Sequence, residues 1–483
     1  MLLLICALLP VVLGGAMPLL RIKNRKLRMT YVFLTTLATS VLAGYIILTN
    51  ADTDLELFRI TDQFVCALHL DGAGKVYLGI AALLWPFAAL YAAEYMRHEH
   101  HEGNFFAWYT VTYGAAVLLS AARNLFTLYV FYEFLTICTL PLVWHEKDKA
   151  SIRAVRRYMI SLFGGAALGF VTLLGLGFMG AGEFIPGGMD LSGKGQWVLW
   201  LAVMGFVGLG AKAAVLPISR WLPTASVAPT PVTALLHAVA VVNAGVFSVL
   251  RLLYYVVSPA TLRGTWAQAL MLGLSALTIL TGSMLAVREQ HMKRRLAWST
   301  VSNLSYMLFG LSLLSPQSLT AGMAHMIFHG LMKIILFFCA GALLVQTGRT
   351  QVRQAHGMGR FMPVTFGAYA VAGASLMGVP PFPGFVSKSA LVTEAFTQGG
   401  FWQLTGAVVL LLSSILTAIY IFTVVFPAFF MKPVLGPREE KPRDPGACMV
   451  ITLVTLSILL VIVGVFSGTV MNWLSHIAGG VMG

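Results

Sequence analysis

Apolar residues fill long runs along almost the entire chain, and only short polar loops separate these runs. A helix needs about twenty mostly apolar residues to cross a bilayer, and each run is close to that length. The longest polar stretch, Lys432–Gly446, is too short to form a soluble domain. We therefore predict an all-α polytopic membrane protein with about fourteen transmembrane helices. The runs lie near residues 2–20, 29–48, 73–95, 104–122, 124–144, 156–180, 196–218, 228–256, 266–287, 297–315, 318–345, 363–386, 403–430 and 447–473.

The composition agrees with this pattern and excludes a water-soluble globular protein. Of the 483 residues, 10% are charged and 58% are hydrophobic, and the mean hydropathy is +0.82. A soluble domain carries charge on about a quarter of its residues. The first run resembles the apolar core of a signal peptide, but no basic residue precedes it and the segment RIKNRKLR follows it. We therefore expect this run to remain as the first span.

Positive charge alternates from loop to loop. With fourteen spans, the loops after odd-numbered spans hold 23 of the 32 Lys and Arg residues, whereas the loops after even-numbered spans hold six. Cytoplasmic loops of membrane proteins are enriched in Lys and Arg, so the odd loops are predicted to be cytoplasmic and both termini to face the opposite side. The net charge of +14 is thus a topology signal, and no nucleic-acid partner is predicted.

No residue pattern in the chain is typical of a metal or redox cofactor site. The five cysteines are too far apart for a zinc site, an iron–sulfur site or a disulfide framework. The sequence also has no Walker loop and no dinucleotide-binding turn. We therefore predict no cofactor and no metal on this chain, and we expect any redox chemistry to lie on another chain.

Four charged residues fit neither a loop nor a helix end and are expected inside the membrane, namely Glu133, Lys212, Lys333 and Lys388. A charge at the centre of a span costs about 3 kcal/mol on insertion scales, so such residues face a wet interior or pair with one another. One interpretation is an ion pathway, and the alternative is a structural ion pair between two helices. The presence of four such charges, together with histidines in the same runs, favours the pathway.

Two of the lysines lie beside prolines that are predicted to break their helices. Lys212 precedes Pro217 by five residues in the seventh span, and Lys388 follows a proline-rich segment in the twelfth. Proline removes a backbone hydrogen bond, and broken helices beside a charge at mid-membrane are typical of ion-coupled transporters. The prolines of the twelfth span are Pro380, Pro381 and Pro383.

The two broken spans are five spans apart, which predicts a repeated five-helix unit. Spans four to eight would form one copy and spans nine to thirteen the other, and an odd number of helices inverts the second copy in the membrane. The predicted divisions are N-terminal helices, first repeat, second repeat, and a cytoplasmic loop with the last span. Their boundaries are 1–103, 104–258, 259–430 and 431–483.

Histidines form the third group of candidate residues. His237 lies in an apolar run that contains no acidic residue, and His325, His329 and Lys333 follow one another at four-residue spacing. Four-residue steps keep them on one stripe of a helix, and histidine can accept and release a proton near neutral pH. The alternatives are hydrogen-bonded core histidines and a metal site, but no third ligand accompanies the HxxxH spacing. The histidines of YMRHEHHEGN are predicted to lie in a solvated loop.

Several segments resemble the antiporter-like subunits shared by respiratory complex I, membrane-bound hydrogenases and Mrp-type cation/proton antiporters. The resemblance runs from about residue 65 to residue 430 and follows the family's order. It is carried by ALHLDGAGKVYLGI, LYVFYEFLTICTLPLV, WLPTASVAPTPVTALLHAVAVVNAG, KRRLAWSTVSNLSYM, AHMIFHGLMKIILFF and GVPPFPGFVSKSALV.

The resemblance implies roles for the candidate residues. Glu133 and Lys212 correspond to the glutamate of the fifth helix and the lysine of the seventh, and Lys388 corresponds to the exit-side lysine of the twelfth. His237 matches a histidine of the eighth helix, and the stripe containing His325, His329 and Lys333 matches the eleventh. The chain departs from several relatives at Asn243, where they carry a lysine, and this leaves His237 to bridge the two halves.

The family implies an antiporter-like subunit that moves protons or sodium ions through these residues. Our first hypothesis places it in a membrane-bound redox complex, hydrogenase-like or complex I-like, in the cytoplasmic membrane of a bacterium or archaeon. Its expected partners are other membrane subunits, peripheral redox subunits that carry iron–sulfur clusters, and the lipid bilayer. The alternatives are a subunit of a Mrp-type Na⁺/H⁺ antiporter and a structural spacer of the membrane arm.

Overall fold

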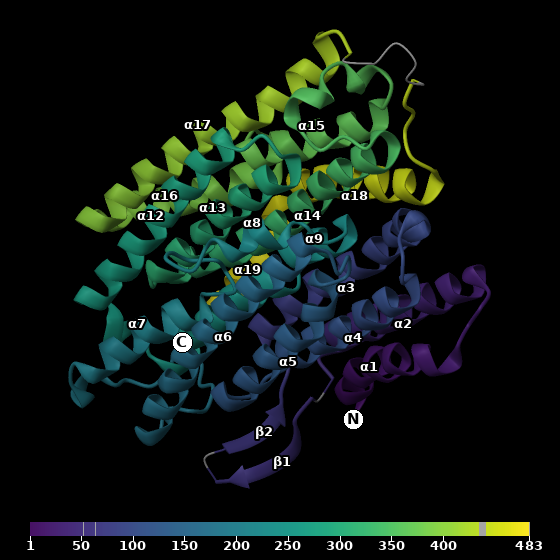
Figure 1. The fold of residues 1–483 in the computed structure, drawn as a ribbon. Coiled ribbons are helices and arrows are strands. Elements are labelled where there is room, and N and C mark those ends of the chain that lie inside the picture. Colours follow the sequence, from purple (N-terminus) through teal and green to yellow (C-terminus); the bar gives the residue numbers. More distant parts are fainter. Residues whose placement is uncertain (52, 63, 434–440, 483) are drawn as a thin grey trace.

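The computed structural model describes residues 1–51, 53–62, 64–433 and 441–482. Within the predicted cytoplasmic loop, residues 434–440 lie outside the described residues. Helices account for most of the chain. The helices are α1 Leu2–Leu20, α2 Arg25–Thr49, α3 Gly72–Tyr95, α4 Glu102–Ser120, α5 Leu125–Val143, α6 Lys149–Phe178, α7 Trp197–Leu209, α8 Trp221–Ala225, α9 Thr230–Ala238, α10 Val241–Arg251, α11 Pro259–Leu262, α12 Trp266–Arg288, α13 Met292–Ser312, α14 Pro316–Thr347, α15 Pro363–Met377, α16 Pro383–Gln398, α17 Phe401–Phe430, α18 Ala447–Val465 and α19 Ser467–Met482. Helices α1 and α2 lie on one side of the bundle and α12, α16 and α17 on the other, while the last helix, α19, returns to the middle (Figure 1).

Among the described residues, ten helical segments are long and apolar enough to cross a membrane. Two further apolar helices, α7 and α15, are shorter. The chain is therefore a helical integral membrane protein, as its hydropathy predicts. The final apolar run differs from the expectation of one span over 447–473, because the chain leaves the helix at Phe466 and resumes it as α19.

A β-hairpin departs from the all-α prediction. Strands β1 (Leu55–Thr61) and β2 (Phe64–Leu68) pair antiparallel before α3. They are too short to register as apolar runs, and only some of their residues, such as Ile60, Thr61 and Val65, are types that favour strands. The hairpin holds the start of α5, because Asn124 donates to the Val65 carbonyl (2.9 Å) and the Ala67 amide donates to Thr127 Oγ1 (3.0 Å). It thereby helps to fix the helix that carries Glu133.

Three helices are interrupted near the middle of the bundle. Helix α7 ends at Leu209, and turns lead to α8, so Lys212 lies within the interruption and Pro217 lies further along it. Helices α15 and α16 are separated by residues 378–382, which include Pro380 and Pro381. A third interruption, between α9 and α10 at residues 239–240, was not predicted, because no proline or glycine marks it.

Helix α14 lies at the centre of the bundle. It packs against α3, α9, α13, α15, α16, α18 and α19, and 25 of its 32 residues are buried. Its two central histidines therefore have helices around them on all sides. Because α9 and α16 both contact α14, this helix connects the interruption near His237 with the one near Lys388.

Candidate functional site

Lys212 is fully buried in the interruption that follows α7. Its ammonium donates a hydrogen bond to the Tyr132 carbonyl of α5 and lies 3.5 Å from the centroid of the Tyr132 ring. The Tyr132 hydroxyl donates to the Leu209 carbonyl (2.9 Å), in the last turn of α7. Gly245 of α10 allows this close packing, since a Cβ there would lie 2.4 Å from the Ala213 nitrogen. The lysine is thus held by a carbonyl dipole and an aromatic face.

Glu133 follows Tyr132 on α5 and interacts electrostatically with Lys212. The two side chains do not approach within the 4.0 Å of an ion pair in the described structure. Glu133 Oε1 is buried and has no hydrogen-bond partner among the described residues. Glu133 and Lys212 are therefore neighbours but do not form an ion pair in the described structure.

His237 lies in the last turn of α9, at the unpredicted interruption. Both of its ring nitrogens are buried and have no hydrogen-bond partner in the described chain, and its ring centroid lies 4.6 Å from that of Phe337 on α14. Asn243 Nδ2 donates to the Ala238 carbonyl (2.9 Å), which the interruption has freed. Asn243 Oδ1 also has no partner among these residues.

The α14 histidines differ in their partners. The ring nitrogens of His329 have none in the described part of the chain, and its ring centroid lies 6.2 Å from that of His325. His325 is held at both nitrogens, by Asn303 Oδ1 at Nε2 (3.2 Å) and by Ser387 Oγ at Nδ1 (2.9 Å). Since an amide oxygen only accepts, Nε2 donates to Asn303, and Nδ1 of the neutral ring accepts from Ser387.

Asn303 also connects this group to Lys333. The Asn303 amide donates to the Ser299 carbonyl (2.7 Å), which fixes the amide orientation. Lys333 donates to Ser299 Oγ and to the Leu296 carbonyl (3.1 Å), both on α13. A connected set of polar groups therefore extends from Lys333 through α13 to His325 and the residue beside Lys388.

Lys388 is buried near the start of α16 and donates to the Leu376 carbonyl (2.6 Å) in the last turn of α15. Its ammonium lies 5.2 Å from the centroid of the Tyr306 ring. Gly384 brings α16 against α15, because a Cβ at that position would lie 1.9 Å from the Ser375 carbonyl oxygen. Lys388 therefore resembles Lys212, since each lies by an interrupted helix and contacts a carbonyl and a tyrosine face.

Tyr306 leads away from Lys388 into a cluster of hydroxyl groups that the sequence analysis did not identify. Its hydroxyl donates to Ser413 Oγ (2.6 Å), which lies within hydrogen-bond distance of Ser283 (2.5 Å) and Ser302 (3.1 Å). The cluster joins α12, α13 and α17. Isolated serines in apolar spans carry only a weak sequence signal, because a serine often bonds its own helix.

A buried ion pair was also missed. Arg251 at the end of α10, near the end of the predicted run over residues 228–256, is 1% exposed and pairs with Asp71. Its second terminal nitrogen donates to Asp71 Oδ1 (2.6 Å). Burial alone would raise the pKa of Asp71, but Arg251 outweighs it and holds this pKa below its ordinary value. The pair joins α3 to the helix that follows the His237 interruption.

The loop histidines predicted to be solvated lie next to a small acidic group. Glu99, His145 and Glu146 each place one possible ligand atom within 4.8 Å of the others. Burial and the nearby Glu146 raise the pKa of Glu99. Lys293 at the start of α13 interacts electrostatically with both acids and donates to the Ala228 carbonyl (2.9 Å). This group links two loops and the start of α13, away from the lysines of the site.

The sequence of this chain is similar to those of known membrane proteins over most of its length. The family described as NADH:quinone oxidoreductase/Mrp antiporter, TM, matches residues 122–417. NADH-quinone oxidoreductase subunit N of Desulforudis audaxviator is 33% identical over 420 residues, which cover 82% of this chain and 80% of that protein. Subunit L of Mycobacterium tuberculosis is 30% identical over 420 residues, which cover 85% of this chain but only 65% of subunit L.

Two solved structures show the same fold at low sequence identity. One is a chain of the membrane-bound sulfane sulfur reductase, an archaeal respiratory membrane complex, with a TM-score of 0.86, 20% identity and coverage of 99% of this chain and 97% of the other. The other is a chain of the Mrp complex from a Dietzia species, with a TM-score of 0.88, 19% identity and coverage of 100% and 98%. The chain belongs to the NADH:quinone oxidoreductase/Mrp antiporter transmembrane family and is an antiporter-like membrane subunit.

Proposed function

We propose that this chain is a proton- or sodium-translocating subunit of a membrane-bound redox complex. One observation carries the proposal: Lys212, His237, His329, His325 and Lys388 are all buried in one bundle, beside helix interruptions or on the helix that connects them. Ionisable groups are costly in a membrane and mark ion pathways when they face a protein interior.

Glu133 and Lys212 would form the first proton-binding site of the relay. An ammonium held by a carbonyl dipole and an aromatic face keeps its proton while those contacts and the nearby carboxylate stabilise the charge. Moving Glu133 toward or away from Lys212 would change the free energy of the charged lysine. Since 1.36 kcal/mol corresponds to a tenfold change in proton affinity, a shift of a few kcal/mol is enough to release or recapture the proton.

His237, Asn243 and His329 would connect the two halves. Buried polar atoms normally have a partner, and ordered water satisfies those that the protein does not. The unpartnered ring nitrogens of both histidines and the Asn243 oxygen are therefore suited to hold a short chain of water molecules. This arrangement supports His237 as the group that takes the bridging place of the lysine that several relatives carry at position 243.

His325 would control the last transfer to Lys388. In the neutral ring Nδ1 accepts from Ser387, but in the protonated ring both nitrogens donate. Protonation therefore requires the Ser387 hydroxyl to turn and accept, which redirects its hydrogen toward its surroundings. Because Ser387 precedes Lys388 on α16, this reversal would couple the charge of His325 to that of the exit lysine.

We also propose that the chain has fourteen spans and two inverted five-helix repeats, with both termini on the non-cytoplasmic side. The matching surroundings of the two lysines support the repeat, since Tyr132 of the fifth span lies by Lys212 of the seventh and Tyr306 of the tenth lies by Lys388 of the twelfth. The second half carries Met307 where the first carries Glu133, so the carboxylate is a feature of the first half alone.

The partners that we propose are other membrane subunits and peripheral redox subunits that hold iron–sulfur clusters. Subunit N of NADH-quinone oxidoreductase supports this, because the match covers most of both chains. The fold shared with a Mrp complex chain favours a second candidate, a subunit of a cation/proton antiporter driven by an ion gradient. Purifying the complex from native membranes and identifying its chains tests the choice. Redox subunits support the first proposal, and small membrane subunits alone support the second.

The Glu133→Gln variant tests transport against a purely structural spacer. The substitution keeps the size of the side chain but removes its charge, so we expect an assembled complex whose ion translocation is reduced at least about tenfold, in line with the loss of a few kcal/mol of coupling. Glu56→Gln, in the exposed part of the hairpin, is the matched control and should translocate normally. Normal translocation by Glu133→Gln would support the spacer.

A further inference from the structure

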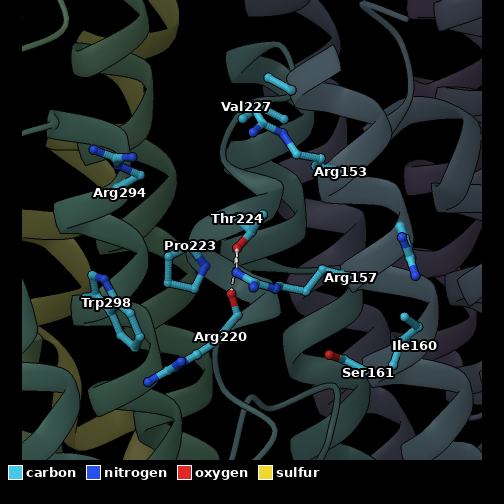
Figure 2. A pocket seen from close by; sticks show the side chains of 12 residues that line it. Arg153, Arg157, Ile160, Ser161, Arg220, Pro223, Thr224, Val227, Arg294 and Trp298 are labelled. Carbon is cyan, nitrogen blue, oxygen red and sulfur yellow. Dashed lines mark hydrogen bonds between the residues drawn. The ribbon is translucent and has the colours of Figure 1, made fainter. Parts of the chain in front are cut away.

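A basic pocket of about 940 Å³ opens between α6, α8 and α13, apart from the buried lysines. Figure 2 shows Arg153 and Arg157 on the α6 side, Arg220 and Thr224 in the middle, and Arg294 with Trp298 on the opposite wall. With Arg156, five arginines from three segments line it. Arg153, Arg156 and Arg157 lie in the first three turns of α6, Arg220 directly precedes α8, and Arg294 lies in the first turn of α13.

The positive charge of this pocket is largely uncompensated. Arg294 pairs with Glu289 (3.1 Å), but none of the other four arginines lies within 4.0 Å of a carboxylate in the described part of the chain. Arg157 donates to Thr224 Oγ1 (3.2 Å), which holds its guanidinium across the pocket. Guanidinium groups bind phosphate oxygens in a two-pronged geometry, so the pocket suits a phosphate group.

An apolar surface continues directly from the arginines. Ile160, one turn deeper on α6, is 65% exposed, and Val227 is 38% exposed. A second cavity of about 560 Å³ between α5 and α6 shares Arg156 and Ile160 with the first. The rest of its lining includes Leu140, Trp144 and Met159, and among the described residues no further charged one lines it. The arginine-lined pocket and the apolar cavity between α5 and α6 therefore form one continuous site.

We propose that this site binds an anionic phospholipid. The phosphate would lie among the arginines of the basic pocket, and an acyl chain would follow the groove between α5 and α6 past Ile160. Basic pockets between membrane helices on the cytoplasmic side bind acidic lipid headgroups, and tryptophan is enriched at that depth. An acidic peptide would use the arginines but would have no use for an apolar groove that opens toward lipid. The proposal does not depend on the ion relay.

Native mass spectrometry of the purified complex tests the site. Phosphatidylglycerol, phosphatidylcholine and inorganic phosphate are added separately, and their binding to the wild type is compared with that to Arg157→Gln/Arg220→Gln. Each basic residue near an anionic lipid contributes about fivefold in affinity, so the double variant should lose about 30-fold for phosphatidylglycerol. Arg21→Gln/Lys23→Gln removes the same charge from another exposed loop and should lose little.

The acyl groove has its own variant. Ile160→Gln should weaken phosphatidylglycerol binding several-fold and leave inorganic phosphate binding unchanged. Equal binding of phosphatidylglycerol and phosphatidylcholine, or unchanged lipid binding by the arginine double variant, would overturn the proposal. So would inorganic phosphate binding that matches lipid binding in every variant, since it would show a simple anion site. Loss of a neighbouring subunit from the double variant, with lipid retained, would identify a protein interface instead.

Discussion

The Asp71–Arg251 ion pair should contribute measurably to the unfolding free energy, because it compensates a buried charge in the helix bundle. Arg251 is 1% exposed and Asp71 20%, and two parallel hydrogen bonds join them. The guanidinium also lies against aromatic rings, with its carbon 4.4 Å from the centroid of Tyr255. The Asp71→Asn substitution removes the negative charge and leaves a buried guanidinium without compensation.

The expected loss follows from this geometry. Breaking a buried pair by removing one partner costs about 3–5 kcal/mol in unfolding free energy. Asp71 also caps α3 by accepting from the Gly74 amide (2.9 Å), but asparagine can keep that bond. Asp71→Ala should therefore cost about 1 kcal/mol more than Asp71→Asn, because it loses the cap as well. Arg251→Met combined with Asp71→Asn should recover much of the loss, since neither charge is then left alone.

Thermal unfolding of the purified protein at neutral pH measures these differences. The low pKa of Asp71 adds a pH signature: the stabilisation is present above its ordinary pKa of 3.8 and is lost as the pH falls through the lower value in the folded protein. Glu56→Gln breaks an exposed pair with Arg59 and should leave the melting temperature unchanged. The single variant Arg251→Met completes the comparison. If the losses of Asp71→Asn and Arg251→Met simply add in the double variant, our account of this pair is wrong.

Three further predictions concern the site and its surroundings. Asn303→Leu should leave the Nε2–H of His325 unpaired, which lowers the unfolding free energy by about 1–3 kcal/mol and reduces ion translocation. Thermal melting and a transport assay measure the two effects, and unchanged transport would contradict the prediction. Gly384→Ala should push α16 away from the Ser375 carbonyl and cost about 1–3 kcal/mol of unfolding free energy. Gly164→Ala lies inside α6, and its added Cβ would have no described atom within 4 Å. This variant should melt at or slightly above the temperature of the wild type, because alanine favours a helix more than glycine does. The raised pKa of Glu99 costs stability as the pH rises above 4.5. Glu99→Gln should therefore have a higher melting temperature than the wild type at neutral pH and the same melting temperature below pH 4.5. A lower melting temperature of Glu99→Gln at neutral pH would refute this.

The helical architecture was predictable because hydrophobic runs of membrane length leave few alternatives. The interruptions by Lys212 and Lys388 were also visible, since proline marks both. The bend before Asn243 was not, because a side-chain amide rather than a proline stabilises it there. The β-hairpin escaped notice because its strands are much shorter than a span.

Long-range contacts account for most of what the sequence could not predict. Asp71 and Arg251 are separated by 180 positions, and only the fold brings them together. Tyr132 and Tyr306 look like ordinary core residues, since nothing local shows that an ammonium lies on their rings. Ser387 and Asn303 could have been noticed, because one is adjacent to Lys388 and the other is a polar residue inside a predicted span.

The central claim is that Lys388 carries the ion out of the relay. The most direct test is ion translocation per electron in proteoliposomes of the purified complex with Lys388→Met, beside Lys194→Met, which alters an exposed loop lysine. We predict that Lys388→Met assembles but translocates far fewer ions per electron through this subunit, and that Lys194→Met matches the wild type. An unchanged ratio in Lys388→Met would contradict the relay.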